Sequence, residues 1–382
     1  MRIPRWIGAV LLLVFALSTF SGTEARQTPQ RVQGIAPAKR PIPPEDVSAA
    51  TTRFSFIVYG DTRGRRDGID VQYEHSLVVD GMLAAIKRLD STEFPVRFVL
   101  QTGDAVLDGG DARHWNASFV SLINRLTTDG GVPYFLAPGN HDVSAAGNLE
   151  SPQRQQALMN YLEVMSQLIP PDGAPRRLSG YPTYAFGYGN TFMLAMDSNI
   201  ASDEKQYQWV KSQLEQLNRK RYTNIVVMFH HPVFSSGPHG GSTVETPTAV
   251  LRSRYMPLFR AHKVKLTLAG HDHLFEHWVE RYRDAQGSPQ RMDLIVTAGG
   301  GAPPYGYRGE PDVTQYVRGN ADSRVQLEHL VKPGPDPGNN PYHFVIVRVD
   351  GDRLGVEVVG IDWGSTFQPY RSNKSDLVDV AR

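Results

Sequence analysis

Apolar and polar positions alternate along this chain in two patterns, one typical of strands and one typical of helices. Short apolar runs bounded by Gly, Pro, Asn or Asp indicate buried strands. Longer segments with apolar residues three or four positions apart indicate amphipathic helices. The two patterns follow each other in turn from about Arg53 onward. They predict strands at residues 54–59, 96–101, 134–137, 224–229, 264–269 and 294–297, and helices at 73–89, 113–126, 153–168, 203–218 and 247–262.

Two β-hairpins complete the predicted elements. One joins residues 183–188 to residues 191–196 through Gly189-Asn190, and the other spans residues 344–361. Gly-Asn is a dipeptide that suits the tight turn of a hairpin. The last hairpin is expected to extend one of the sheets.

Strands that alternate with helices favour an α/β fold in which sheets pack between helices. Residues 299–341 follow neither periodicity and are expected to be irregular. Nothing marks a boundary inside residues 53–362, although a separate second domain is an open alternative. We therefore predict one domain over this range and a carboxyl-terminal tail over residues 363–382.

The amino terminus, residues 1–25, has the layout of a secretory signal peptide. Two arginines precede an apolar run from Trp6 to Phe20, and small and polar residues follow it. An uncleaved membrane anchor is the alternative, but the run is shorter than the ~20 residues of a spanning helix. Residues 26–52 are rich in Pro, Ala and Arg and are expected to form an extended linker. We expect a periplasmic or secreted protein with no stable membrane anchor after cleavage.

Charge and cysteine content narrow the classes of function. The chain has 40 Lys and Arg against 39 Asp and Glu, so its composition predicts no general attraction to nucleic acid or to anionic membranes. It also shows no basic stripe interleaved with aromatic residues, and no specific nucleic acid binding is expected. Cysteine is absent, which excludes disulfides, thiolate metal sites and a cysteine nucleophile. Any metal site must use oxygen and nitrogen ligands.

Polar side chains that suit metal binding follow five of the predicted strands. The carboxyl ends of parallel strands share one edge of a sheet, so groups far apart in sequence meet there. Carboxylate, amide and imidazole donors together suit zinc, manganese or iron better than calcium. The groups are Gly60-Asp61, Gly103-Asp104, Gly139-Asn140-His141-Asp142, His230-His231-Pro232 and Gly270-His271-Asp272-His273.

In order and spacing, these five motifs resemble those of the calcineurin-like metallophosphoesterase family, and they are also similar to those of its purple acid phosphatase branch. The resemblance covers roughly residues 53–361. It implies a four-layer α/β/β/α sandwich with mixed sheets and a centre of two divalent or trivalent metal ions, Fe, Zn or Mn. The implied ligands are Asp104 for both ions, Asp61 and His273 for one ion, and Asn140, His230 and His271 for the other.

The resemblance also implies an activity, the hydrolysis of a phosphoric monoester or diester by a hydroxide that two metal ions activate. His141 matches the family's histidine that assists the leaving oxygen, and Asp142 is expected to orient the ring of His141. The expected substrate is a phosphorylated small molecule or a diester. A catalytically impaired protein of the same fold, which binds a metal or a phosphate ligand, is the alternative.

Two positions depart from the family pattern. Many members have a histidine where this chain has Arg63, and the purple branch has a tyrosine where this chain has Leu107. A charged arginine cannot serve as a metal ligand, so the ion bound by Asp61 lacks one expected protein ligand. His75, in the following helical segment, is a candidate replacement. The alternative is a histidine with no role in the site.

Arg63 and His239 are candidate substrate-binding residues. A guanidinium beside the metal ion suits a phosphate group, and an ordinary salt bridge is the alternative. His239 lies in a Gly-rich segment, at a place where purple acid phosphatases carry histidines that contact the substrate. The alternative for His239 is a solvent-exposed loop residue.

Overall fold

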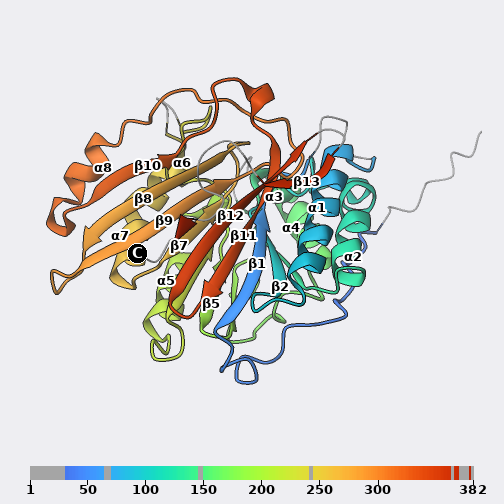
Figure 1. The fold of residues 1–382 in the computed structure, drawn as a ribbon, viewed down its shortest axis with the longest axis horizontal. Helices are drawn as coiled ribbons and strands as arrows, with labels where there is room; N and C mark the ends of the chain where they lie inside the picture. Colours follow the sequence, from blue (N-terminus) through green and yellow to red (C-terminus); the bar gives the residue numbers. More distant parts are fainter. Residues whose placement is uncertain are drawn as a thin grey trace, which may run out of the picture. The chain divides into compact units, whose positions relative to one another are not determined.

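Two mixed β-sheets lie face to face and helices cover their outer faces (Figure 1). This computed structural model describes residues 31–63, 70–144, 149–240 and 244–362, together with the backbone of 365–369 and 378–379. The predicted four-layer α/β/β/α sandwich with mixed sheets is confirmed.

The first sheet has the strand order β13-β12-β11-β1-β2-β3, in which β13 is Ser365–Pro369. Strands β1, β2 and β3 are parallel to one another, and β11 and β12 are antiparallel additions. Helix α1 packs on the outer face, where its buried side chains meet β11 and β12, and α2 packs beside α1. The bounds are β1 Arg53–Tyr59, α1 Tyr73–Leu89, β2 Val96–Gln101, α2 Ser121–Thr128, β3 Tyr134–Leu136, α3 Asn140–Val143, α4 Pro152–Val164, β11 Tyr342–Asp350 and β12 Arg353–Asp362.

The second sheet has the order β10-β8-β9-β7-β6-β5-β4. Strands β5, β6, β7 and β9 are parallel, and β4, β8 and β10 run antiparallel to their neighbours. Apolar side chains of helices α5 and α7 share a core with this sheet. The bounds are β4 Tyr184–Tyr188, β5 Thr191–Ala195, α5 Glu204–Glu215, β6 Asn224–Met228, α6 Thr246–Val250, α7 Met256–Ala261, β7 Leu266–Ala269, β8 Phe275–Arg283, β9 Pro289–Thr297, α8 Thr314–Gly319 and β10 Gln326–Val331.

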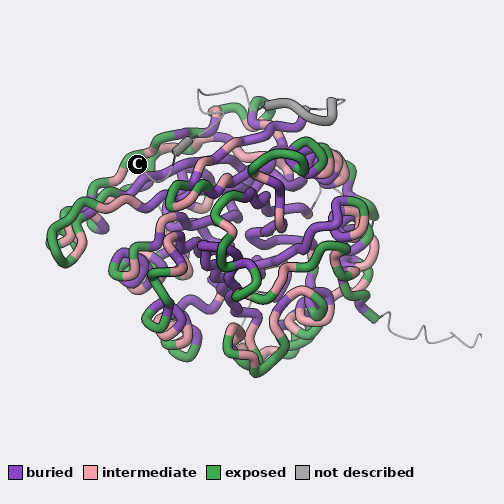
Figure 2. The backbone as a smooth tube through the Cα atoms, turned by 60° about the horizontal axis from the view of Figure 1, so that its bottom comes forward, coloured by how far each residue is buried: buried purple, intermediate pink, exposed green. Residues whose placement is uncertain are grey.

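Aromatic side chains fill the core between the two sheets. The rings of Phe56 and Phe98 stack with centroids 5.3 Å apart, and Phe135 of the first sheet stacks on Phe186 of the second at 4.2 Å. Such ring pairs add about 0.5 to 1.5 kcal/mol to the free energy of burial. Figure 2 shows the buried strands at the centre and the exposed backbone toward the periphery. This rigid core fixes the loops at the ends of the strands.

The sequence pattern located most elements but missed the strands β8 and β10 and the first half of β9. Strand β8 carries two buried acids, Glu276 and Glu280, at positions where the pattern requires apolar residues. Glu280 is neutralised by Arg260, whose Nη1 lies 3.0 Å from its carboxylate. A partner from another element makes these acids tolerable, and no local pattern reveals such a partner. Within the predicted irregular stretch 299–341, the structure also places helix α8.

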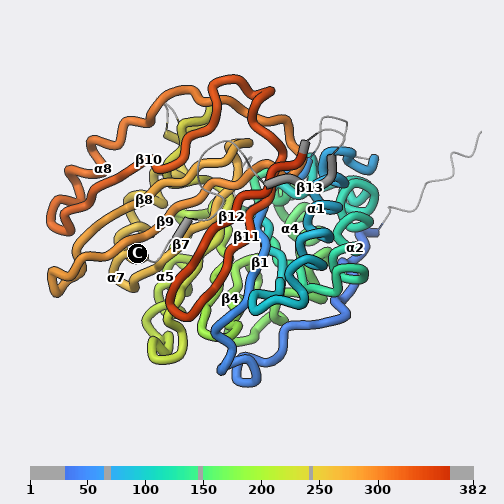
Figure 3. Tube along the Cα trace, in the orientation of Figure 1, coloured from blue at the N-terminus to red at the C-terminus, as the bar shows by residue number. Residues whose placement is uncertain are grey.

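Residues 31–52 do not form a free linker. The segment runs from beside α2 to the start of β1 (Figure 3), and the Lys39 amide donates to the Thr127 carbonyl. Ile35 is fully buried, and Glu45 accepts hydrogen bonds from Arg176 and from the hydroxyl of Tyr222. The predicted boundary at residue 53 is therefore corrected, because a chain without periodic structure is still ordered when its polar groups bond to the domain.

The remaining predictions concern the two ends of the chain, the signal peptide and the carboxyl-terminal tail. The predicted signal peptide, residues 1–25, lies outside the described residues. Within the predicted tail, the short strands β13 Ser365–Pro369 and β14 Val378–Asp379 both pair with β12. Across the part of the chain that the structure describes, helices are too short or too polar to cross a bilayer.

Candidate metal centre

The loops at the carboxyl ends of five parallel strands meet at one edge of the sandwich. Strands β1, β2 and β3 end there from one sheet, and β6 and β7 end there from the other. Apart from the partly exposed Asn140, the predicted ligand residues in these loops are at most 8% exposed. The six predicted ligands that meet are Asp61, Asp104, Asn140, His230, His271 and His273.

Backbone conformation at this edge is unusual. Asp61, Asp104 and His271 have positive φ angles of 59°, 52° and 72°. Such left-handed conformations of residues other than glycine cost on the order of 1 kcal/mol or more and cluster at functional sites. The loops also approach each other closely, since a Cβ atom on Gly270 would lie 2.4 Å from Oδ2 of Asp61. The fold thus holds these side chains in a fixed and strained arrangement.

Two histidines direct bare nitrogen lone pairs into the site. Nδ1 of His230 lies 3.0 Å from the carbonyl oxygen of Thr102, which can only accept, so this nitrogen carries the proton. Nε2 of His271 lies 2.9 Å from a carboxylate oxygen of Glu245 and donates to it. In the neutral rings, Nε2 of His230 and Nδ1 of His271 therefore have no hydrogen.

These two nitrogens converge with oxygen atoms that also lack a hydrogen. Oδ1 of Asn140 lies 2.9 Å from Nε2 of His230 and 3.1 Å from Nδ1 of His271, and the two nitrogens are 3.1 Å apart. Oδ1 of Asp104 lies 3.4 Å from Nε2 of His230. Ligands bound at ~2.1 Å to one ion stand about 3.0 Å apart at a right angle and about 3.4 Å apart at the tetrahedral angle. The atoms of Asn140, His230 and His271 therefore fit a single metal ion, and the distance from Asp104 to His230 is that of a fourth ligand.

The protonation states support this arrangement. Burial lowers the pKa of His230 to about 3, so its ring is neutral near neutral pH. Burial alone would raise the pKa of Asp104, but nearby His230, His141 and Arg63 outweigh it and hold the pKa below the usual range. Metal ligands must be neutral imidazoles and ionised carboxylates, and these two residues meet that condition.

The second predicted position is built differently. Oδ1 of Asp61 lies 3.5 Å from Nε2 of His273, whose Nδ1 donates to the carbonyl of Pro303 at 2.9 Å. In this half of the site the guanidinium of Arg63 lies against Asp104 and His273. It donates from Nε to Oδ2 of Asp104 at 3.2 Å and from Nη2 to His273 at 3.4 Å. This half of the site therefore contains a cationic side chain where Asp104 and His273 converge.

His141 lies beside Asp104 at the rim of the site. Its Nε2 is 3.9 Å from Oδ2 of Asp104, and its Nδ1 donates to the carbonyl of Leu107 at 2.8 Å. The prediction that Asp142 orients this ring is wrong. The Asp142 carboxylate accepts hydrogen bonds from the backbone amides of Ala105, Val106 and Gly139 instead, and so it holds two loops of the site together.

His75 does not lie with Asp61 and His273. Its ring is fully buried in the core, stacked against Phe119, and its Nε2 lies 3.1 Å from the hydroxyl of Tyr59. Burial lowers the pKa of His75 to about 3. The expectation that it replaces the missing ligand is therefore corrected, because the side chain points from helix α1 into the core, toward Phe119 and Tyr59.

Glu245 is a site residue that the sequence did not reveal. One of its oxygens accepts from His271, and the other lies 3.0 Å from Nδ1 of His239. The hydrogen bond to Glu245 raises the pKa of His239, whose ring also packs on His271 with centroids 4.3 Å apart. His239 therefore lies beside the site as predicted, but its Nδ1 is bonded to Glu245. Because Glu245 precedes the short helix α6, its local sequence suggests only a helix cap.

A hollow of about 420 Å³ opens next to the four converging ligand atoms. It falls in the range of about 300 to 1,000 Å³ that is usual for small-molecule sites. On the other side of the centre, the ring of Tyr305 stacks on His273 at 4.2 Å, and the loop 299–305 closes over Asp61 and His273 through backbone hydrogen bonds. The hollow is lined by Asn140, Asn199, Ala201, Ser202, His231, Glu245, Thr246, Pro247, Val250 and His271.

Purple acid phosphatases are similar to this chain in sequence. Purple acid phosphatase 4 of Arabidopsis thaliana is 25% identical over 260 residues, which cover 65% of this chain and 68% of that protein. The Fe(3+)-Zn(2+) purple acid phosphatase 12 of the same plant is 25% identical over 224 residues, 55% of this chain and 44% of its own length.

A solved structure shows the same fold. The purple acid phosphatase from yellow lupin (Lupinus luteus) seeds superimposes with a TM-score of 0.60 at 17% identity, over 84% of this chain and 53% of that one. The sequence model of the calcineurin-like phosphoesterase family matches residues 54–275, which is more than half of the chain. The protein therefore belongs to the calcineurin-like phosphoesterase family and is a hydrolase of phosphoric esters.

Proposed function

We propose that this protein hydrolyses a phosphorylated small molecule or a small diester at the centre described above, with two metal ions and with His141 assisting the leaving group. The observation that carries the proposal is the meeting of lone pairs from Asn140, His230 and His271 within 3.1 Å of one another, with Oδ1 of Asp104 at 3.4 Å from Nε2 of His230. Bare lone pairs repel each other, so a cation is the partner that stabilises them. Bound metal ions supply Lewis acidity and lower the pKa of water.

The protein's own residues then bind and position the substrate. The hollow beside Asn140 and His271 has room for the organic part of a small phosphate ester. Because Nδ1 of His141 is fixed on the Leu107 carbonyl, its Nε2 faces the centre. In the protonated ring, Nε2 can hold a proton for the leaving oxygen, which is the role of a general acid.

The proposed second ion would be held by Asp61, Asp104 and His273. A relative carries an Fe(3+)-Zn(2+) pair in its name, which supports a centre of two metals of the Fe, Zn or Mn type. In this chain, Arg63 lies between Asp104 and His273, so the guanidinium must move for the second ion to bind. Once displaced, Arg63 is placed to bind a phosphate oxygen of the substrate, since its fork of donors matches that group.

The test is a metal add-back assay. Protein stripped with a chelator is loaded with Zn²⁺, Mn²⁺ or Fe, and the turnover of aryl phosphate monoesters and diesters is measured alongside metal content. We expect metal-dependent turnover of at least one ester class. His141→Ala should keep its metals and lose turnover by ~10²-fold or more. Bound metal without turnover of any ester would instead identify an impaired protein that only binds its ligand.

We also propose that the protein acts in the periplasm or outside the cell. The proposal is supported by the arginines and the apolar run at the amino terminus. Expression of the full chain, followed by cell fractionation and amino-terminal sequencing, tests it. A mature chain that still begins at Met1 in the cytoplasm would contradict the proposal.

A further inference from the structure

A second hollow, far from the metal centre, is lined by basic side chains. It has a volume of about 680 Å³ and lies at the edge of the second sheet where β7, β9 and β10 begin and β8 ends. The metal ligands follow the opposite end of β7, so the strand separates the two sites. The lining residues are Arg219, Lys263, Lys265, Arg281, Tyr282, Arg283, Pro289, Gln290, Arg291, Arg324 and Gln326.

Seven of these residues are cationic, and none of the lining residues that the structure describes is an acid. The whole chain has 40 basic and 39 acidic residues, so composition alone does not produce such a cluster. The positive residues come from five separate segments of the chain, which is why no basic stripe is visible in the sequence. A concave surface of one charge sign focuses the electric field and attracts ions of the opposite charge.

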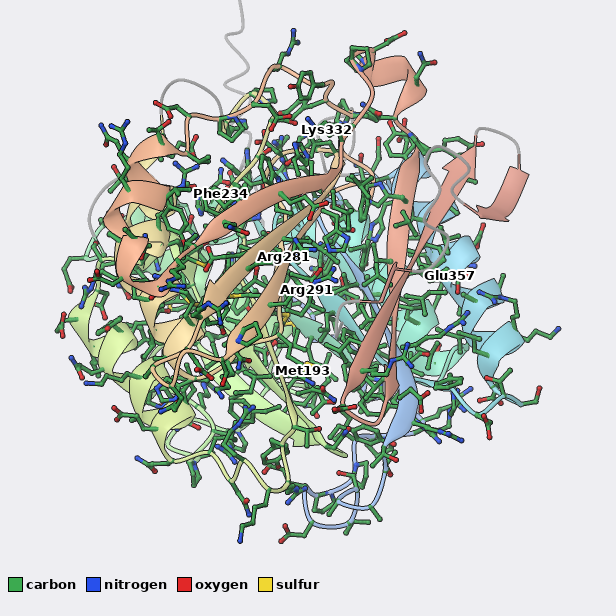
Figure 4. The ribbon with its side chains drawn as sticks, turned by 60° about the vertical axis from the view of Figure 1, so that its left-hand side comes forward. Met193, Phe234, Arg281, Arg291, Lys332 and Glu357 are labelled. Carbon is green, nitrogen blue, oxygen red and sulfur yellow. The ribbon has the colours of Figure 1, made fainter. Side chains whose placement is uncertain are left out.

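The pairing of β8 with β9 adds to the concentration of charge. Arg281 and Arg291 stand directly opposite each other in the antiparallel pair (Figure 4). Like charges in this position are unfavourable for the sheet. Each arginine has a carboxylate partner outside the lining, Glu328 for Arg281 at 2.6 Å and Asp293 for Arg291 at 2.7 Å. These partners fix the two side chains and offset part of their repulsion.

Of the remaining cations, Lys263 lies 2.8 Å from the carboxylate of Asp284, and the other four have no ion pair with any described acid. Lys265 donates to the amide oxygen of Asn224 at 2.9 Å, and Arg283 donates to the carbonyl of Gly287 at 2.6 Å, both neutral acceptors. For Arg219 and Arg324, the structure gives no ion pair with any described acid. Burial lowers the pKa of Lys265, the nearby carboxylate of Asp352 raises it in part, and the charge of Arg219 lowers it again. The hollow thus holds positive charge that a bound anion would neutralise.

We propose that this hollow binds a small anion with several phosphate groups, at a site separate from the metal centre. Guanidinium groups bind phosphate oxygens through pairs of parallel hydrogen bonds, and four cations without carboxylate partners match an anion of high charge. The volume is that of a small-molecule site. The site is distinct from the proposed catalytic function and does not depend on it.

The test uses inorganic tripolyphosphate as the probe and calorimetry on the full chain with its metals bound. We expect saturable binding that weakens at least 10-fold in a double variant, Arg219→Gln with Arg324→Gln. A control variant with the same loss of charge at exposed positions elsewhere, Lys39→Gln with Lys87→Gln, should bind like the wild type. Neither double variant should change the turnover of an aryl phosphate.

Three outcomes would overturn the proposal. The first is equal tripolyphosphate binding by the wild type and the Arg219/Arg324 double variant, which would place the anion elsewhere. The second is equal competition by sulfate at matched ionic strength, which would mean that charge is merely screened. The third is tighter binding of a single-stranded oligonucleotide, or of vesicles containing an anionic lipid, through the same two arginines. That result would assign the hollow to a macromolecular surface.

Discussion

The two halves of the metal centre share Asp104 but differ in the groups that face their ligand atoms. In one half, acceptor atoms of Asn140, His230 and His271 lie 2.9 to 3.1 Å apart with no hydrogen among them, and an oxygen of Asp104 lies 3.4 Å from His230. In the other half, Asp104 and His273 face the guanidinium of Arg63, which donates to both. One half requires an external cation, and the other half contains a cation of its own.

This difference teaches that the two metal positions need not bind with equal strength. The first ion enters a site whose ligands are already placed and repel each other without it. The proposed second ion would have to displace Arg63, and it would have one protein ligand fewer than the family resemblance implies, because Arg63 and Leu107 depart from the family pattern. We therefore expect one tightly bound ion and one that exchanges readily.

Substitution of one ligand in each half gives the largest expected effect. His230→Ala should remove the tightly bound ion and lower turnover by at least ~10²-fold. Mutation of residues that only support metal ligands already lowers metal affinity or activity about 10- to 100-fold. His273→Ala should keep the tight ion, since its ring belongs to the other half. Metal content by mass spectrometry and turnover on the same samples check this pair, and loss of both ions in both variants would mean that the halves are equivalent.

Glu245 provides the second comparison, because its carboxylate supports His271 and not His273. Glu245→Gln keeps the size of the side chain but weakens the hydrogen bond that fixes the His271 ring and its tautomer. We expect the affinity for the tight ion to fall about 10- to 100-fold, as for other carboxylate partners of metal-binding histidines. Competition with a chelator of known affinity measures this change. Unchanged affinity would show that Glu245 serves His239 alone.

Arg63→Ala should raise the affinity of the weaker half for its metal ion, whereas the substitutions above lower metal affinity. Removing a positive charge that contacts Asp104 lowers the repulsion that the second ion meets, and at an effective dielectric constant near 20 such contacts are worth a few kcal/mol. After allowance for solvent, we expect second-ion affinity to rise about 10-fold while KM for a phosphate ester also rises. Arg63→Lys, which keeps the charge, is the matched control. A variant that binds the second ion more weakly would show that Arg63 supports the site.

The ligands could be predicted from the sequence because each one follows a strand whose apolar run is plain. Convergence of Asp61, Asp104 and His271 then follows from the topology of parallel strands. The position of the Arg63 guanidinium could not be predicted, since it depends on contacts with residues over 40 and over 200 positions away. The same limit applies to Glu245 and to the strand β8, where partners distant in sequence decide the environment of a charged group.

Substitution of His75 should have the smallest effect on the metal centre, but a measurable effect on the pH dependence of the free energy of unfolding. The pKa of His75 is lowered by burial to about 3, compared with about 6.5 in an unfolded chain. Between these values the unfolded chain binds a proton that the folded protein excludes, so the free energy of unfolding falls as the pH falls from 6.5 toward 3. The slope from one such histidine is roughly 1 kcal/mol per pH unit.

His75→Phe should remove this part of the acid sensitivity and leave the number of bound metals unchanged. The phenyl ring can pack in the same place against Phe119, and the Tyr59 hydroxyl keeps its partner Tyr134 at 2.8 Å. Urea unfolding at pH 7 and pH 5 measures the effect, and the difference between the two pH values should be smaller in the variant than in the wild type. A lost metal ion in His75→Phe would instead place this histidine in the weaker half of the centre, and the comparison of the two halves would have to be redrawn around it.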